Sequence, residues 1–175
     1  TGKSNGTVTY ANAMRVKAGN NSQFFKNSNA NQSEPEPATI EKNRLWLNIS
    51  NESGDFNETL VGYVTNATNG LDKAFDGANL SAGTTTLYSI IDNNNLVIQG
   101  RALPFTNTDV VPLGIKISTA GQYTINMDQF DGLFTNQNIY LFDSLTNTTH
   151  DLKVSDYVFN SEIGTFNSRF EIRYV

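Results

Sequence analysis

The sequence predicts an all-β protein, an antiparallel β-sandwich of the jelly-roll type with at most one very short helix. Two features lead to this prediction. The 175 residues include 24 Asn and 13 Gly, which favour turns, together with 19 Thr, 11 Phe and 7 Tyr, which favour strands. Roughly ten to twelve short apolar segments follow one another at spacings of about 8–14 residues, which is typical of sandwiches and barrels.

The clearest strand pattern lies between Thr86 and Met127. Polar turns divide this block into four apolar segments, and the turn Asp92–Asn95 separates the first two. In the last two segments apolar residues recur at every second position, so each strand has one face on a core and one in water. The break at Thr119–Gln122 predicts a hairpin between these two strands. The alternating residues are Val111, Leu113, Ile115 and Ile117, then Tyr123, Ile125 and Met127.

Three parts of the chain differ in pattern. Residues 1–26 hold short strand candidates that we interpret as completing an upstream module. Residues 27–43 have almost no apolar content and include Pro35 and Pro37, so they are predicted to be a polar linker or loop. Residues 44–175 are predicted to form the β-sandwich domain. The upstream strand candidates are Gly6–Tyr10, Met14–Lys17 and Gln23–Lys26.

Within the sandwich domain, turn residues bound each predicted strand. Arg44–Ser50 is the first strand, and Glu58–Thr65 follows after a turn at Asn51–Asp55. Residues 70–77 form the only segment with helical character, of about two turns at most. After Met127 the predicted strands are Asn138–Asp143, Thr149–Val154, Tyr157–Asn160 and Asn167–Val175. In the last of these, Phe170, Ile172 and Tyr174 are predicted to face inward, and Arg169, Glu171 and Arg173 outward.

Composition excludes several classes of protein. The net charge is −5 and the pI is about 4.7, and the 12 basic residues are scattered, so no nucleic-acid partner is expected. No apolar run approaches the roughly 20 residues of a transmembrane segment. Thr1–Gly6 lacks the apolar core of a signal peptide, so a targeting segment is expected to lie outside this sequence. Without Cys, disulfides and thiolate zinc sites are excluded.

His150 is the only histidine, and a catalytic role would require a nucleophile at a tight turn or partner ligands for a metal. No nucleophile elbow, metalloprotease helix, P-loop or dinucleotide-binding motif is present. We therefore interpret His150 as a strand-end residue that caps a turn or pairs with Asp151. No catalytic, cofactor-binding or metal-binding residue is assigned, and the protein is not expected to be an enzyme.

The 17 acidic residues offer two further chemistries. A glycoside hydrolase needs two carboxylates that face each other across a cleft. The acidic residues lie largely in turns, as Asp109 and Asp143 do, and we interpret them as solvated. Two sequence pairs could share one hard cation with backbone carbonyls, although neither matches the EF-hand loop. At most a structural calcium ion is expected, at Asp72 with Asp76 or at Asp128 with Asp131.

Trp46, Tyr63 and Tyr88 are predicted to lie on the strand faces opposite the aliphatic residues of their strands. Rings exposed on one sheet would stack on the C–H faces of sugars. A carbohydrate-binding module, with a surface glycan as its partner, is therefore the alternative function. The competing interpretation is that both faces of these strands are covered and that the rings are buried.

The chain contains six linked segments: NRLWLNIS, ETLVGYVTNAT, LYSIIDNNNLVIQGRALPF, VVPLGIKISTAGQYTI, DGLFTNQNIYLFDSLTNTTHDL and RFEIRYV. Together they resemble the β-sandwich region of large secreted proteins of flavobacteria, in the phylum Bacteroidetes. In those proteins the region lies just ahead of the C-terminal sorting signal that the type IX secretion system reads. The upstream segment GTVTYANAMRVKAGNNSQFFK resembles the stretch that precedes this region.

The resemblance implies export to the cell surface or the medium, with the type IX secretion machinery as partner. It implies a non-catalytic module that serves in surface display or adhesion, and a sorting domain is expected after Val175. Proteins of this phylum resemble one another in carrying O-glycans at Asp-Ser/Thr followed by an apolar residue. The triplet from Asp143 to Leu145 matches this motif, so Ser144 is a hypothetical O-glycosylation site.

Overall fold

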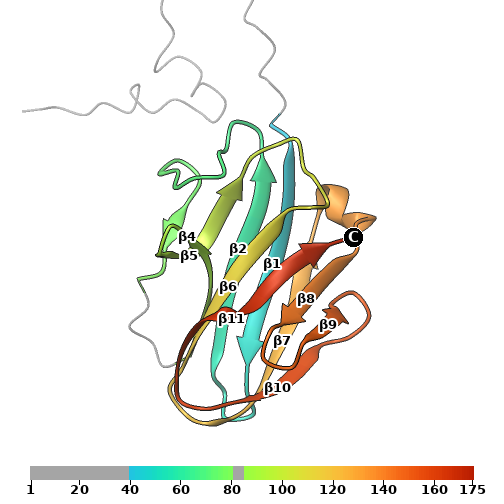
Figure 1. Cartoon of the computed structure of the whole chain (residues 1–175). Helices are drawn as coiled ribbons and strands as arrows, with labels where there is room; N and C mark the ends of the chain where they lie inside the picture. Colours follow the sequence, from blue (N-terminus) through green and yellow to red (C-terminus); the bar gives the residue numbers. More distant parts are fainter. Residues whose placement is uncertain (1–39, 81–84) are drawn as a thin grey trace, which may run out of the picture. The chain divides into compact units, whose positions relative to one another are not determined.

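A computed structural model gives the structure of residues 40–80 and 85–175 (Figure 1). Residues 39–175 form one compact unit, and the strands predicted between residues 6 and 26 lie outside the described residues. The first described strand begins at Lys42, so the predicted end of the linker at Asn43 falls inside a strand. These residues continue the strand because their backbones pair with Val64 and Tyr63.

The described residues form strands, loops and one short 3-10 helix, which confirms the predicted all-β class. The helical character predicted for residues 70–77 is wrong. The carbonyl of Asp72 accepts bonds from the N–H groups of Phe75 and Asp76 in a single turn, and the chain then enters a strand at Gly77. The elements are β1 Lys42–Ser50, β2 Phe56–Val64, β3 Gly77–Ala78, β4 Thr86–Ile91, β5 Asn94–Arg101, β6 Val110–Ile117, β7 Gly121–Phe130, η3 Gly132–Thr135, β8 Ile139–Asp143, β9 Thr148–Asp151, β10 Tyr157–Ser161 and β11 Gly164–Tyr174.

The eleven strands of the described residues belong to one sheet, which curls until it is nearly barrel-shaped (Figure 1). The order along the sheet is β10-β7-β1-β2-β5-β4-β6-β11-β8-β9, and β3 pairs with β5 off this path. Neighbouring strands are antiparallel except for β2 and β5, which run parallel. The two ends of this order, β10 and β9, follow each other in the chain but share no ladder among the described residues.

Three connections between consecutive strands are hairpins: β1–β2, β4–β5 and β8–β9. The β4–β5 hairpin confirms the break predicted at Asp92–Asn95. Its two turn residues, Asp92 and Asn93, have φ values of 46° and 65°. These left-handed values suit the right-handed twist of a two-residue hairpin, and Asp and Asn tolerate them better than most residues do.

The hairpin predicted across Thr119–Gln122 is wrong. β6 pairs with β4 and β11, whereas β7 pairs with β1 and β10. Between β6 and β7 the chain thus crosses from one pair of strands to another. It crosses back between β10 and β11, because Ser161 of β10 pairs with Gly121 of β7 while Gly164 of β11 pairs with Ile117 of β6. The antiparallel ribbon that runs from β6 to β11 therefore folds over at this point. A hairpin and a crossing place the same alternate residues on the core, so the period-2 pattern does not distinguish them.

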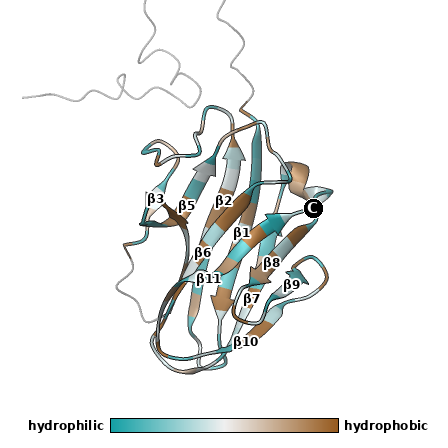
Figure 2. Ribbon diagram, viewed as in Figure 1, coloured by the Kyte–Doolittle hydropathy of each residue, from teal (hydrophilic) through white to brown (hydrophobic). Residues whose placement is uncertain are grey.

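Apolar side chains from all parts of the sheet order meet in one core. The residues of β1 predicted to face inward, Leu45, Leu47 and Ile49, have no exposed surface. Figure 2 shows the alternation of hydrophobic and hydrophilic residues along the strands that produces this interior. In the central block and in β11 the predicted inward residues are also buried, namely Val111, Leu113, Ile115, Ile117, Tyr123, Ile125, Phe170, Ile172 and Tyr174.

A glycine in β6 makes room for an aromatic ring on the outer face of the sheet. Tyr88 of β4 is directly paired with Gly114, so their side chains share one face. A Cβ at Gly114 would lie only 2.7 Å from Cζ of Tyr88 and 2.8 Å from Oδ1 of Asn167. The Tyr88 hydroxyl donates a 2.7 Å hydrogen bond to that same oxygen. The ring thus lies across the glycine and joins β4 and β6 to β11.

Substitution Gly114→Ala is expected to destabilise the protein by about 1–3 kcal/mol, because the new methyl group overlaps a buried ring that has no room to move. Urea unfolding measures the change. The control is Gly121→Ala, since a Cβ there meets no atom within 4 Å, and its expected effect is within about 0.5 kcal/mol. Equal stability of the two variants would contradict this account of Gly114.

Candidate functional site

Tyr63 does not present its ring to solvent, so the hypothesis of an exposed stacking ring fails here and the competing interpretation, a buried ring, applies. Its side chain is 1% exposed and lies on the same face of β2 as the core residue Val61. β2 has apolar residues at both odd and even positions, so the period-2 alternation does not show which of the two sets faces inward. Leu60 and Val64 lie on the opposite face of the strand, point outward and are half-buried.

Tyr88 is on the outer face, as predicted, but it is only 2% exposed because its ring covers Gly114. Trp46 is half-buried and faces outward opposite Leu60. The Arg44 guanidinium carbon lies 4.8 Å from the centroid of its ring. Of the three predicted stacking residues only Trp46 therefore retains surface, and the three rings do not form a shared platform.

The inward-facing Tyr63 belongs to a polar cluster within the core. Its hydroxyl donates a 2.6 Å hydrogen bond to Asp109. Arg101 of β5 donates to both oxygens of the same carboxylate, at 2.6 and 2.7 Å. Arg101 is the last residue of β5 and Asp109 lies just before β6. This bidentate pair therefore connects the two ends of the β5–β6 loop. Asp109 was predicted to be a solvated turn residue, and that interpretation is wrong.

Burial alone would raise the pKa of Asp109, but the bonds from Arg101 and Tyr63 outweigh it and hold the pKa below its ordinary value. Burial also raises the pKa of Tyr63 and of the neighbouring Tyr174. Both phenols therefore stay neutral. Tyr63 donates to a charged carboxylate and is not an acid or base in the physiological range.

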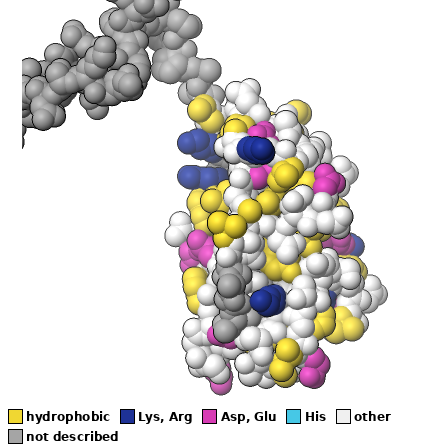
Figure 3. Space-filling model, turned by 90° about the vertical axis from the view of Figure 1, so that its left-hand side faces the viewer, with side chains coloured by type: hydrophobic (Ala, Val, Ile, Leu, Met, Phe, Trp, Pro, Cys, Tyr) yellow, Lys and Arg dark blue, Asp and Glu magenta, His cyan; other side chains and the backbone are white. Residues whose placement is uncertain are grey.

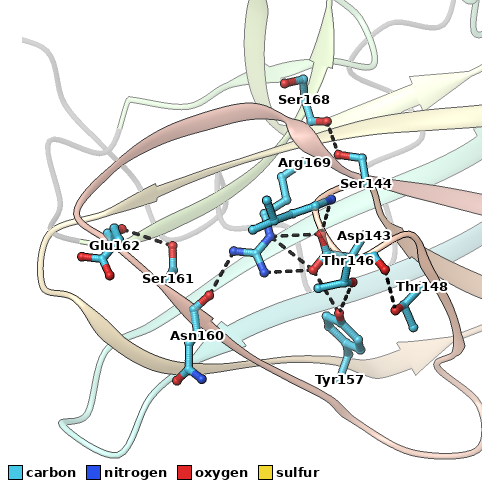
Figure 4. Close-up of polar contacts among 11 residues, drawn as sticks. Asp143, Ser144, Thr146, Thr148, Tyr157, Asn160, Ser161, Glu162, Ser168 and Arg169 are labelled. Carbon is cyan, nitrogen blue, oxygen red and sulfur yellow. Dashed lines mark hydrogen bonds and ion pairs between the residues drawn. The ribbon is translucent and has the colours of Figure 1, made fainter.

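A second cluster of the same residue types joins strands at the two ends of the sheet order (Figure 4). Asp143, at the end of β8, is completely buried. Nη2 of Arg169 lies 2.9 Å from Oδ2 of this carboxylate, and the Tyr157 hydroxyl donates to the same oxygen at 2.9 Å. Arg169 also donates to the carbonyl of Asn160, at 3.1 Å. These bonds connect β8 and β11 to β10, which no ladder joins to them.

Arg169 and Asp143 were predicted to be solvent-facing, and both predictions are wrong. The pairing of β11 shifts between Phe166 and Phe170, and the irregular segment turns Arg169 inward. There its guanidinium carbon lies 4.7 Å from the ring centroids of both Phe159 and Phe170. Charge, hydrogen bonds and ring contacts therefore hold the side chain from several directions.

Burial by itself would raise the pKa of Asp143, but the Arg169 guanidinium and the Tyr157 hydroxyl hold this pKa below its ordinary value. Burial raises the pKa of Tyr157, and the adjacent carboxylate raises it further. The cluster therefore contains a charged pair and a neutral phenol. Every oxygen of the carboxylate already accepts a hydrogen bond from the protein, which leaves no lone acid or base for chemistry.

Ser144, the hypothetical O-glycosylation site, follows the buried aspartate in the turn between β8 and β9. It is exposed, as is Leu145, which is 73% exposed. The Ser144 hydroxyl donates a 2.9 Å hydrogen bond to the carbonyl of Ser168 (Figure 4). The triplet thus consists of one residue fixed in the interior and two residues at the surface.

His150 lies in β9, and its Nε2 is 2.8 Å from the carbonyl oxygen of Ser155. This contact ties the strand to the loop that leads to β10, which is a turn-capping role of the kind predicted. The alternative partner, Asp151, instead accepts a 2.8 Å hydrogen bond from the backbone of Lys153. His150 therefore acts within the connection between the two end strands.

Hydrogen bonds from backbone groups and an arginine occupy one carboxylate of each proposed calcium pair. Asp76 accepts from the N–H groups of Asp72 and Gly100, at 2.6 and 2.8 Å. Asp131 accepts from the backbone and the side chain of Arg44, at 2.5–2.8 Å. Within residues 40–80 and 85–175 no group of three or more acidic or histidine side chains is arranged to hold a metal ion.

The sequence pattern did not indicate a groove of about 440 Å³ between the 71–79 loop and the β4–β5 turn. We call it the amide groove, because it is lined by four asparagines, Asn79, Asn93, Asn94 and Asn95, together with Lys73 and Asp76. From sequence alone, the three consecutive asparagines indicate only a turn. Their second role depends on the loop that packs opposite them, which local sequence does not reveal.

The family model described as "Domain of unknown function (DUF8693)" matches residues 1–174. The chain belongs to this family. No curated protein and no solved structure matches it. Among the described residues, no helix has the length and apolar character needed to cross a bilayer.

Substitution Asp143→Asn is expected to lower the free energy of unfolding by about 3–5 kcal/mol, because it leaves the Arg169 guanidinium buried without its counter-charge. Chemical denaturation measures the loss. Glu171→Gln is the control, since it breaks the ion pair with Arg173 in which both side chains are partly exposed, and its expected cost is at most about 1 kcal/mol. Similar losses in both variants would show that Asp143 does not act through a buried charge.

Acidification is expected to destabilise the protein through the same carboxylates. The folded-state pKa of Asp143 and that of Asp109 lie below the ordinary value of 3.8. Their contribution to stability is therefore fully present above that value, and it is lost as the pH falls through the folded-state pKa values. Urea titrations between pH 7 and pH 2.5 should show this loss, with a shallower slope in Asp143→Asn. A variant that loses stability as steeply as the parent would contradict the assignment.

Proposed function

We propose that the chain is a non-catalytic β module of a surface-exposed or secreted protein that is exported by type IX secretion and serves in surface display or adhesion. The observation that supports a non-catalytic role is that the buried charged side chains are all engaged in ion pairs. The buried charged residues of the described chain are Arg101, Asp143 and Arg169, and each is in an ion pair that connects segments of the sheet. None of these three residues is therefore free to exchange a proton or bind a substrate, as a catalytic group must be.

The finer architecture is part of this proposal. We describe the curled sheet as a flattened sandwich of the jelly-roll type, and two observations support the description. Residues of β1 and β7 share one apolar core with residues of β6, β8 and β11. The pairs β6–β11 and β7–β10 are nested, and both strands of this ribbon pass from one pair to the other at the same point, at residues 118–120 and 162–163. A ribbon that folds over on itself is the topology of a jelly roll.

The surface part of the proposal rests on the sequence resemblance and on the character of the surface. The chain is acidic, with a net charge of −5. On the face seen in Figure 3, uncharged polar groups and backbone predominate, and basic side chains form no continuous patch. In this proposal Ser144 is an O-glycosylation site, and its exposed position in the β8–β9 turn leaves room for a glycan.

The test is the location of the full-length protein in a flavobacterium that has a type IX secretion system. Antibodies against residues 40–175 are expected to label intact cells, and a protease added outside the cells is expected to remove the label. Inactivation of the secretion system should retain the protein inside the cell. Detection only in the cytoplasm of normal cells would falsify the proposal. Mass spectrometry of the native protein then shows whether the peptide that contains Ser144 carries a glycan.

A further inference from the structure

We propose that the amide groove is a binding site for a saccharide. The groove lies between the segment of residues 71–79, which includes β3, and the turn that joins β4 to β5. Its volume of about 440 Å³ falls in the range of small-molecule sites, which is roughly 300–1,000 Å³. Nothing in this proposal depends on Trp46, Tyr63 or Tyr88, the residues that the sequence pattern had indicated for sugar binding.

The first wall of the groove is fixed by contacts with β5. The Asp76 carboxylate accepts the N–H of Gly100 at 2.8 Å and, with its other oxygen, the N–H of Asp72 at 2.6 Å. Phe75 packs so closely on Gly100 that a Cβ there would meet its side chain. The N–H of Asn79 donates to the carbonyl of Asn95 at 2.8 Å, which holds the two walls together.

The second wall is the turn between β4 and β5. Asp92 and Asn93 adopt left-handed φ values there, and the Asn94 amide donates to the carbonyls of Ile91 and Asp92, each at 3.2 Å. Both walls are thus held by hydrogen bonds within the protein before any ligand arrives. A preformed site loses less conformational entropy on binding than a flexible one.

The groups that remain in the groove match the chemistry of a sugar. Asn93 and Asn95 are exposed, and their side chains make no hydrogen bond with the described residues. A side-chain amide presents an acceptor and two donors side by side, which complements a pair of neighbouring hydroxyl groups. Lys73 is exposed and forms no ion pair with the described residues, so its ammonium can donate to a further hydroxyl. Leu71, which is 50% exposed, supplies an apolar contact for a C–H face.

Other ligand classes fit less well. A phosphorylated ligand would require several cationic groups, and Lys73 is the one cationic residue that lines the groove. A metal ion would require free carboxylate oxygens, whereas both oxygens of Asp76 already accept hydrogen bonds from backbone N–H groups. A neutral, hydroxyl-rich ligand uses the amides without these requirements. The inference is independent of the export proposal, because binding is measured with the purified chain.

The test is a glycan array of neutral plant, fungal and microbial oligosaccharides probed with the chain of residues 1–175, followed by calorimetric titration with the best-bound oligosaccharide. The double variant Lys73→Ala/Asn95→Ala is expected to raise the Kd by about tenfold or more, the sum of two lost hydrogen bonds. The matched control is Lys116→Ala/Asn107→Ala, which removes the same residue types at exposed positions outside the groove lining and should leave the Kd unchanged.

Unchanged urea midpoints in both double variants show that any change in Kd is local. The proposal is overturned if the chain binds no oligosaccharide on the array. It is also overturned if the groove and control variants weaken binding equally, or if Trp46→Ala abolishes binding while the groove variant retains it. None of these outcomes bears on where the full-length protein is found, so the failure of one proposal leaves the other intact.

Discussion

The closed form of the sheet depends on the buried ion pair between Arg169 and Asp143. The ends of the sheet order, β10 and β9, share no backbone ladder in the described chain, and this pair, with the Tyr157 hydroxyl, connects β10 to β8 and β11 near the other end. Charges in a protein interior carry a desolvation cost of several kcal/mol per ion, so such a pair persists only with good geometry and further hydrogen bonds. Here those bonds come from β8, β10 and β11 together. The main effect of the pair is therefore to specify which strands meet, and its contribution to net stability is smaller.

The cluster of Arg101, Asp109 and Tyr63 repeats this chemistry elsewhere in the core. In both clusters an arginine binds an aspartate through two of its nitrogen atoms while a tyrosine hydroxyl donates to the same carboxylate. In both, the aspartate lies at the border between a strand and a connection, where backbone geometry changes. Connections that contain few apolar residues are thus fixed by charge, while the strands are fixed by apolar packing.

The sequence was sufficient to predict the strands and most of their inward faces, because residues such as Leu45 and Ile172 alternate with polar neighbours. It was insufficient where two arrangements satisfy the same pattern. The segments on either side of Thr119–Gln122 alternate equally well in a hairpin and in a crossing, and β2 has apolar residues on both faces, which concealed the orientation of Tyr63. The buried ion pairs were also missed, since an aspartate next to a turn has the same local sequence whether it is solvated or paired. The amide groove depends on two segments that meet only in the folded chain.

The nesting of β7–β10 within β6–β11 has a consequence for the order of folding. The contacts near the sheet ends join residues close in sequence, since Tyr157 is 14 positions and Arg169 is 26 positions from Asp143. The bond of Arg44 to Asp131 instead spans 87 residues. Closing the longer loop costs about 1 kcal/mol more in chain entropy than closing the 26-residue one. Long-range contacts are also formed more slowly than local ones. The ribbon from β6 to β11 can therefore form first, together with the contacts of Asp143, Tyr157 and Arg169. β7 is then the edge strand with which β1 pairs.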